Sequence, residues 1–247
     1  MKIYTTLQIG EFHINYCEDF LIKEQLTSHE ILIAVLDGCT MGTESVFASI
    51  LYGKILRKVA KNKFYEEFIA KQNQEINLQL KLKSILQELI YETREIKNNL
   101  GLETNELLST IILGIIDTKN YKAELITIGD GLICIDRKII EYEQNNTPDY
   151  LGYHLTENFE DFYKNQQQKL SISSFTDLSI STDGIFTFKN LENQNLQKKE
   201  SEIIDYLLID NNESEFDNFL DRKIRNLKKI NHVVTDDLAI IRIKKNK

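Results

Sequence analysis

The sequence predicts an α+β fold of two packed antiparallel β-sheets flanked by helix pairs. Strand-like and helical segments come in blocks instead of alternating one by one, which favours antiparallel sheets over a doubly wound parallel sheet. In addition, the segment Ile31-Leu-Ile-Ala-Val-Leu36 is apolar at every position, so both of its faces must be covered. Strands of this kind need two stacked sheets with helices on the outside.

Seven segments have the pattern of strands, and polar turn residues bound most of them. Three of these segments follow one another through the turns Asp117–Asn120 and Gly129–Gly131, which predicts an antiparallel meander. The predicted strands cover residues 2–9, 31–36, 108–117, 121–128, 132–136, 177–182 and 237–243.

Four further segments carry apolar residues at helical spacing. A polar patch at Gln72–Gln74 would interrupt the second of them, and Gly101 would end it. Residues 137–170 are polar and irregular, which indicates a loop with a short helix. The predicted helices cover about residues 43–60, 64–99, 199–209 and 213–229.

Size and composition favour one domain that spans residues 1–247. Hydrophobic residues make up 42% of the chain, enough for a substantial core, and neither proline nor glycine marks a linker. The net charge of −8 repels phosphate backbones and anionic lipid, so neither nucleic acid nor a membrane is an expected partner. We expect a monomer.

Cysteine use and the lack of a leader pattern predict a cytoplasmic location. Cys17, Cys39 and Cys134 are isolated in the sequence, which is typical of a reducing compartment. The first residues soon turn polar, unlike a signal peptide. The longest apolar runs fall far short of the roughly 20 residues that a membrane helix needs.

Three of the predicted strands carry a carboxylate at one end. Asp37-Gly38 and Asp183-Gly184 each follow an apolar strand, and Asp236-Asp237 opens the last one. Glu18-Asp19, between the first two predicted strands, adds two more carboxylates. Hard cations such as Mg²⁺ and Mn²⁺ prefer carboxylate oxygens, and two-metal hydrolases hold two ions about 4 Å apart. The pattern therefore indicates a metal site.

Each of these pairs has a simpler interpretation when it is taken alone. Asp-Gly is a common turn dipeptide, in which glycine permits a sharp turn. An acidic strand entry or a solvated acidic turn is equally ordinary. The metal hypothesis therefore depends on the order and context of all the pairs together.

In order and spacing, these residues resemble the metal-dependent (PPM-type) serine/threonine protein phosphatases of type 2C, as a divergent, bacterial-like member. The resemblance runs from about residue 9 to residue 243 and consists of short motifs, each with a counterpart in the family. The motifs are Cys17-Glu-Asp19, Val35-Leu-Asp-Gly38, Leu108-Ser-Thr110, Ile128-Gly-Asp-Gly131, Ser181-Thr-Asp-Gly184 and Thr235-Asp-Asp237.

The resemblance implies an α-β-β-α sandwich that binds two ions, Mn²⁺ or Mg²⁺. Asp37 would bridge the two ions, and Asp37, Asp183 and Asp236 are the candidate catalytic residues. The implied ligand set is Glu18, Asp37, the Gly38 carbonyl, Asp183 and Asp236, with Asp19 beside Glu18 and with Asp130 at a third, weaker site.

The implied reaction is hydrolysis of phosphoserine or phosphothreonine in proteins, so the implied partner is a phosphoprotein substrate. In this family, metal ions lower the pKa of a bound water, which attacks phosphorus without a covalent enzyme intermediate. The ions also offset charge on the phosphoryl oxygens.

Four positions depart from the family pattern. Ile14 occupies the place of a phosphate-binding Arg, and Cys39 occupies that of a His found in many members. Thr40-Met-Gly42 replaces a Gly-Gly pair, and Thr187 replaces an Asp of the third metal site, which implies two ions rather than three. Two alternatives therefore stay open: a weakly active or inactive regulatory or binding domain on the same fold, and a phosphatase of small molecules.

Overall fold

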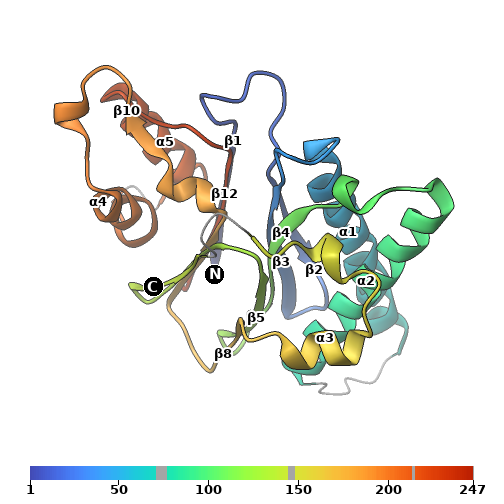
Figure 1. Cartoon of the computed structure of the whole chain (residues 1–247). Coiled ribbons are helices and arrows are strands. Elements are labelled where there is room, and N and C mark those ends of the chain that lie inside the picture. Colours follow the sequence, from blue (N-terminus) through green and yellow to red (C-terminus); the bar gives the residue numbers. More distant parts are fainter. Residues whose placement is uncertain (71–76, 144–147, 213–214, 247) are drawn as a thin grey trace.

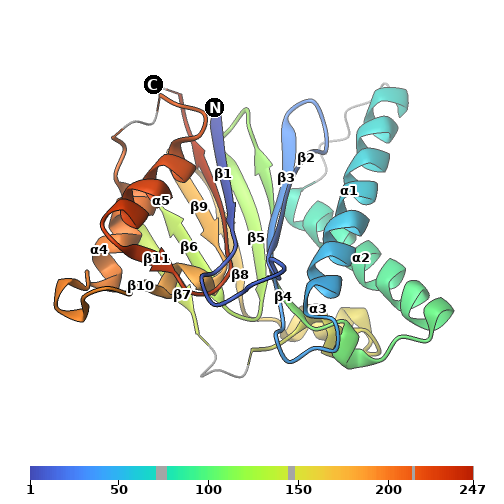
Figure 2. The same ribbon diagram turned by 90° about the horizontal axis from the view of Figure 1, so that it is seen from above.

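The computed structural model describes residues 1–70, 77–143, 148–212 and 215–246. Two five-stranded antiparallel sheets pack face to face, and helices cover both outer faces (Figures 1 and 2). The predicted fold class is thereby confirmed.

In each of the two sheets, the order of the strands in space differs from their order along the chain. One sheet has the order β1 (Lys2–Gln8), β12 (Leu238–Lys244), β9 (Asp177–Ser181), β6 (Gly131–Ile135), β7 (Lys138–Tyr142). The other has the order β2 (Phe20–Gln25), β3 (Glu30–Gly38), β4 (Ser109–Asp117), β5 (Lys122–Ile128), β8 (Lys169–Ile172). The strands β10 (Phe188–Asn190) and β11 (His232–Val234) pair with each other and form a separate two-stranded ribbon.

The helices form the two outer layers, as Figure 2 shows. On the sheet that contains β3 lie α1 (Ser45–Ala70) and α2 (Leu78–Leu100), with the short α3 (Phe159–Asn165) near them. On the sheet that contains β12 lie α4 (Glu200–Ile204), which continues into the π-helical turn η5 (Asp205–Ile209), and α5 (Phe219–Lys229). The 3₁₀ turns are η1 (Thr104–Glu106), η2 (Leu151–His154), η3 (Asp183–Phe186) and η4 (Gln194–Leu196).

A hydrophobic core fills each of the three gaps between these four layers. Along β3, Leu32, Ala34 and Leu36 belong to the core under α1 and α2. Ile33 and Val35, which point the opposite way, belong to the core between the two sheets. Because every position from 31 to 36 is apolar, each face of this strand contributes to a different core, as the sequence predicted.

The predicted meander is wrong at its third strand. β4 and β5 pair as expected, but β6 pairs with β7 and β9 in the opposite sheet. The residues between β5 and β6 thus form a crossing from one sheet to the other and not a hairpin turn. Gly129 and Gly131 have positive φ angles of 98° and 132°, which direct the chain across.

Several element boundaries also differ from the predictions. α1 continues through the break expected after residue 60, and α5 starts at Phe219 instead of residue 213. The polar patch Gln72–Gln74 lies outside the described residues, whereas Gly101 ends α2 in the left-handed conformation as predicted. The segment 137–170, predicted as mostly loop, contains β7 and the first residues of β8 besides α3. β2 was not predicted, because half of its residues are polar.

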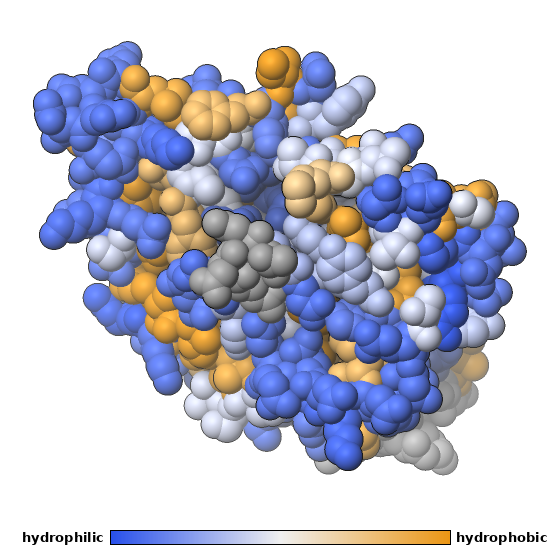
Figure 3. Space-filling model, in the orientation of Figure 1, coloured by the Kyte–Doolittle hydropathy of each residue, from blue (hydrophilic) through white to orange (hydrophobic). Residues whose placement is uncertain are grey.

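The exposed surface carries only separate apolar patches on the face shown in Figure 3. Among the described residues, no helix combines the length and the hydropathy that crossing a membrane requires.

A buried arginine of β12 pairs with an aspartate of the same sheet and joins that sheet to the outer helical layer. The Arg242 side chain is fully buried and donates to both carboxylate oxygens of Asp177, at 3.0 and 2.7 Å. It also donates to the carbonyl oxygens of Leu207 and Asp210, both at 2.9 Å, and to Asn211 Oδ1 at 2.7 Å. One guanidinium therefore satisfies acceptors on β9 and at the end of η5.

Asp177→Ala should destabilise the protein by about 3–5 kcal/mol, because it leaves the Arg242 charge buried without its carboxylate. The matched control is Glu92→Ala, which breaks the exposed Lys58–Glu92 pair at 2.9 Å and should cost less than about 1 kcal/mol. Urea unfolding measures both. Equal losses in the two variants would show that the buried pair has no special weight.

Candidate metal centre

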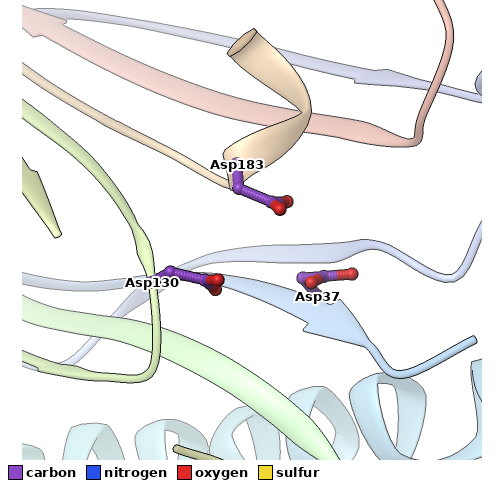
Figure 4. Close-up of side chains that lie close together, drawn as sticks. All are labelled: Asp37, Asp130 and Asp183. Carbon is purple, nitrogen blue, oxygen red and sulfur yellow. The ribbon is translucent and has the colours of Figure 1, made fainter. Parts of the chain in front are cut away.

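Three aspartates from three different strand ends converge at one edge of the two sheets (Figure 4). Asp37 lies at the end of β3, Asp130 lies in the crossing between β5 and β6, and Asp183 opens η3 directly after β9. One carboxylate oxygen from each lies within 4.8 Å of the other two. The two sheets therefore bring together residues that are up to 146 positions apart, from Asp37 to Asp183.

The glycines after Asp37 and Asp183 allow the backbone to pack closely at this edge. A Cβ on Gly38 would lie 2.1 Å from the Ser45 carbonyl oxygen, and one on Gly184 would lie 1.8 Å from that of Asp237. Neither glycine has a positive φ. The sequence suggested glycine for a sharp turn, but close backbone contact is the reason for it here.

Asp19 lies beside Asp37 because β2 pairs with β3. Phe20 is opposite Leu36, so continuing the antiparallel register by one residue brings Asp19 to Asp37. The two carboxyl groups are close enough for the charge of Asp19 to raise the pKa of Asp37. The Thr182 hydroxyl donates to Asp19 Oδ2 at 2.6 Å, so a group from the opposite sheet holds Asp19.

Burial and mutual repulsion raise the pKa values of these carboxyl groups. Burial raises the pKa of Asp37, and the charges of Asp19 and Asp183 raise it further. Burial, with the charges of Asp130 and Asp236, raises the pKa of Asp183 to about 7. Burial also raises the pKa values of Asp19 and Asp130.

The donor set fits a hard cation. In the part of the chain that the structure describes, no Lys, Arg or His forms an ion pair with Asp19, Asp37, Asp130 or Asp183. Asp19 Oδ1 and Asp130 Oδ1 are buried and have no hydrogen-bond partner among those residues. Buried carboxylate oxygens without donors are what Mg²⁺ or Mn²⁺ would coordinate.

Glu18 and Asp236 lie outside this group of three. The Thr40 hydroxyl donates to Glu18 Oε2 at 2.8 Å, and the Asp236 side chain is 47% exposed. Asp236 is nevertheless close enough for its charge to raise the pKa of Asp183. The predicted set is thus divided into a buried group and two carboxylates at the rim.

Asp237 is a structural neighbour of the rim. Its side chain accepts hydrogen bonds from the backbone N–H groups of Gly10, at 2.8 Å, and Glu18. His13 lies with Nδ1 3.0 Å from Asp237 and Nε2 3.6 Å from Asp236, and its role was not predicted. Burial lowers the pKa of His13, but its hydrogen bond and ion pair with Asp237 outweigh burial, so the pKa is raised. Only its position just before Ile14 could have pointed to it.

The positions that depart from the family pattern have distinct surroundings. The Ile14 side chain is 91% exposed, and Cys39 is buried against the Tyr150 hydroxyl. The Thr187 hydroxyl donates to the Gly184 carbonyl at 2.9 Å and accepts from the Asp236 backbone N–H at 3.1 Å. Thr187 therefore connects the two strand ends that carry Asp183 and Asp236.

A sequence model of protein phosphatase 2C matches residues 10–234, most of the chain. The chain belongs to the protein phosphatase 2C family. No curated protein matches it in sequence.

Three bacterial structures share its fold at low sequence identity. A bacterial serine phosphatase is 12% identical over 100% of this chain and 99% of its own, with a TM-score of 0.56. The phosphatase 2C domain of SpoIIE from Bacillus subtilis, with a fragment of its regulatory domain, is 14% identical over 98% of this chain and 62% of its own, with a TM-score of 0.59. The SiaA phosphatase 2C domain of Pseudomonas aeruginosa is 12% identical over 99% and 86%, with a TM-score of 0.58. These likenesses show the phosphatase 2C fold.

We expect this phosphatase, without metal, to lose stability as the pH rises from 5 to 8. The folded-state pKa of Asp183 is raised to about 7, so its contribution is complete below about pH 4 and is lost as the pH rises through 7. Asp183→Asn removes this charge and should stabilise the metal-free protein at pH 8, on the order of 2–4 kcal/mol. Thermal melts in chelator at several pH values measure the effect.

The control variant is Asp161→Asn, which changes an exposed carboxylate in the first turn of α3. It should leave the slope of stability against pH as it is in the wild type. If Asp183→Asn also leaves that slope unchanged, Asp183 does not carry the unfavourable charge.

Proposed function

We propose that the chain is a metal-dependent phosphatase that hydrolyses phosphoserine or phosphothreonine in proteins. Membership of the phosphatase 2C family supports phosphatase activity. The observation that carries the metal dependence is the group of Asp37, Asp130 and Asp183, partly buried together and without an ion pair to a Lys, Arg or His among the described residues. A metal ion would relieve the repulsion that raises their pKa values.

In this proposal two ions, Mn²⁺ or Mg²⁺, bind at the edge shared by the sheets. As the family resemblance implies, Asp37, Asp183 and Asp236 would hold one ion, and Asp37, Glu18 and the Gly38 carbonyl would hold the other. Asp130 would supply a further oxygen.

When bound, such ions lower the pKa of a coordinated water and offset charge on the phosphoryl group. The residues of this chain hold the carboxylates of the site in position. The Thr182 hydroxyl orients Asp19, and the Thr40 hydroxyl orients Glu18. Thr187 fixes the backbone of Asp236 relative to η3.

The three cysteines of the chain are free, which agrees with work in a reducing compartment such as the cytoplasm. A phosphoprotein of that compartment would be the substrate. The negative charge of the protein disfavours nucleic acid as a partner.

A second candidate function is a regulatory or binding domain with little turnover. Two observations favour it: Ile14 is 91% exposed and offers no cation, and buried Cys39 offers no imidazole to protonate a leaving group. Turnover of a small aryl phosphate with added Mn²⁺ separates the two functions. Rapid metal-dependent release removes this second candidate, whereas metal binding without release supports it.

Asp37→Asn should lower Mn²⁺-dependent hydrolysis of a phosphoserine peptide by at least about a hundredfold, because a bridging carboxylate is lost and metal contributes several kcal/mol to such reactions. The change preserves side-chain volume, so circular dichroism should be that of the wild type. Excess Mn²⁺ should raise the melting temperature of the wild type and have less effect on the variant.

Asp161→Asn again serves as the matched control and should retain full activity. Undiminished hydrolysis by Asp37→Asn would reject the metal assignment.

A further inference from the structure

A groove leads away from the metal centre along the β10–β11 ribbon. It consists of an inner hollow of about 430 Å³, lined by Phe12, Thr187 and Asp236 among others, and an outer hollow of about 570 Å³, lined by Ile185, Leu191 and Lys198 among others. Phe186 and Lys189 line both hollows. The groove therefore begins at Asp236, a predicted metal ligand, and extends from there to Leu191 and Lys198.

Lys189 is a cation that lines both hollows, together with Lys198 and Glu200 in the outer one and with Asp236 in the inner one. Its side chain is exposed, and its Nζ lies 5.7 Å from the centre of the Phe12 ring. No carboxylate among the described residues forms an ion pair with it, although the protein as a whole carries a net charge of −8. Lys189 is thus available to an anion from outside.

The backbone that carries Lys189 is well anchored. Lys189 is the middle residue of β10 and pairs with Val233 of β11. The Gln197 side chain accepts from the Asn190 N–H at 2.7 Å and donates to the Phe188 carbonyl at 3.1 Å. A substrate that bound here would meet a preformed surface.

Apolar side chains lie on both sides of Lys189. Phe12 is 63% exposed and Leu191 is 52% exposed, and Phe186 is partly buried between them in the groove lining. Over the region of β10 and α4, at the upper left of Figure 3, hydrophobic and hydrophilic surface alternate. The groove thus places Lys189 among apolar side chains, while Lys198 and Glu200 also line the outer hollow and Asp236 lines the inner one.

We propose that this groove selects the phosphoprotein by the residues that flank its phosphoserine, an inference that rests on the proposed function. An acidic side chain of the substrate pairs with Lys189, and an apolar side chain packs against Phe186 and Leu191. A hollow of about 430 Å³ is roughly 9 Å across, the length of about three extended residues. The acidic residue therefore lies within about three positions of the phosphoserine.

The test compares phosphoserine peptides that differ only in one flanking residue, acidic, neutral or basic, together with a small aryl phosphate. Lys189→Met should lower the ratio of kcat/KM for the acidic to the neutral peptide about fivefold, the upper range for an exposed ion pair. The ratio in the wild type should fall as ionic strength rises. Lys189→Glu should reverse the preference toward the basic peptide.

Lys54→Met is the matched control, because it makes the same change of charge at an exposed position of α1, on the opposite outer layer. It should leave the ratio at the wild-type value. Leu191→Ser should lower kcat/KM only for peptides that carry an apolar flanking residue.

The outcomes distinguish the groove from the active site. If the wild type does not hydrolyse the aryl phosphate with Mn²⁺, the proposed function fails. If it does, but Lys189→Met leaves the peptide ratio unchanged, the groove inference fails. A loss of equal size on all substrates also overturns the inference, because Lys189 would then bind the phosphoryl group itself.

Discussion

The packing of the two sheets against each other is the constraint on which the metal centre depends. β3 supplies Ile33 and Val35 to the core between the sheets, and β12 supplies Ala239 and Ile241. A shift of β12 by one residue would move Arg242 from the helical layer into the core between the sheets, and a shift of β3 would draw Asp37 or Glu30 into an apolar layer, so the register of both strands is fixed. Because Asp37 is the next-to-last residue of β3 and Asp236 lies two residues before β12, the same packing fixes the strand ends that carry these carboxylates.

The groups that hold Asp19 and Glu18 in place are neutral, and this has an electrostatic consequence. Hydroxyl groups of Thr182 and Thr40 position these two carboxylates, whereas His13 pairs with Asp237 at the rim. Lysine or arginine in these places would have cancelled the negative charge. Neutral donors instead leave it available for an added cation, and burial strengthens the field because the local dielectric constant is low. Burial and the mutual repulsion of the carboxylates raise the pKa values of Asp37 and Asp183, and the same negative charge would attract a metal ion.

Local patterns in the sequence were enough to predict the layers and most of the carboxylates. Continuous apolar runs identify strands that serve two cores, and Asp-Gly after such a run identifies a crowded strand end. The errors concern pairing between distant segments. Nothing local assigns β6 to the opposite sheet, so Asp130 was predicted only for a weak third site, whereas the structure places it with Asp37 and Asp183. β2 was missed because it is half polar, and its register with β3 is what brings Asp19 to Asp37.

The ribbon that lines the groove is continuous in the chain with two strand ends of the candidate metal centre, those that carry Asp183 and Asp236. β10 follows η3, which begins with Asp183, and β11 runs directly into Thr235 and Asp236. The Thr187 carbonyl accepts from both the backbone N–H and the hydroxyl of Thr235, at 3.3 and 2.8 Å, so the ribbon is fastened where it meets the centre. Ile14 provides no cation for phosphate, and Thr187 serves as a brace. If the proposed function holds, substrate recognition would therefore fall to side chains of the ribbon, and a peptide bound along it would be aligned with Asp183 and Asp236 by the same backbone that holds them.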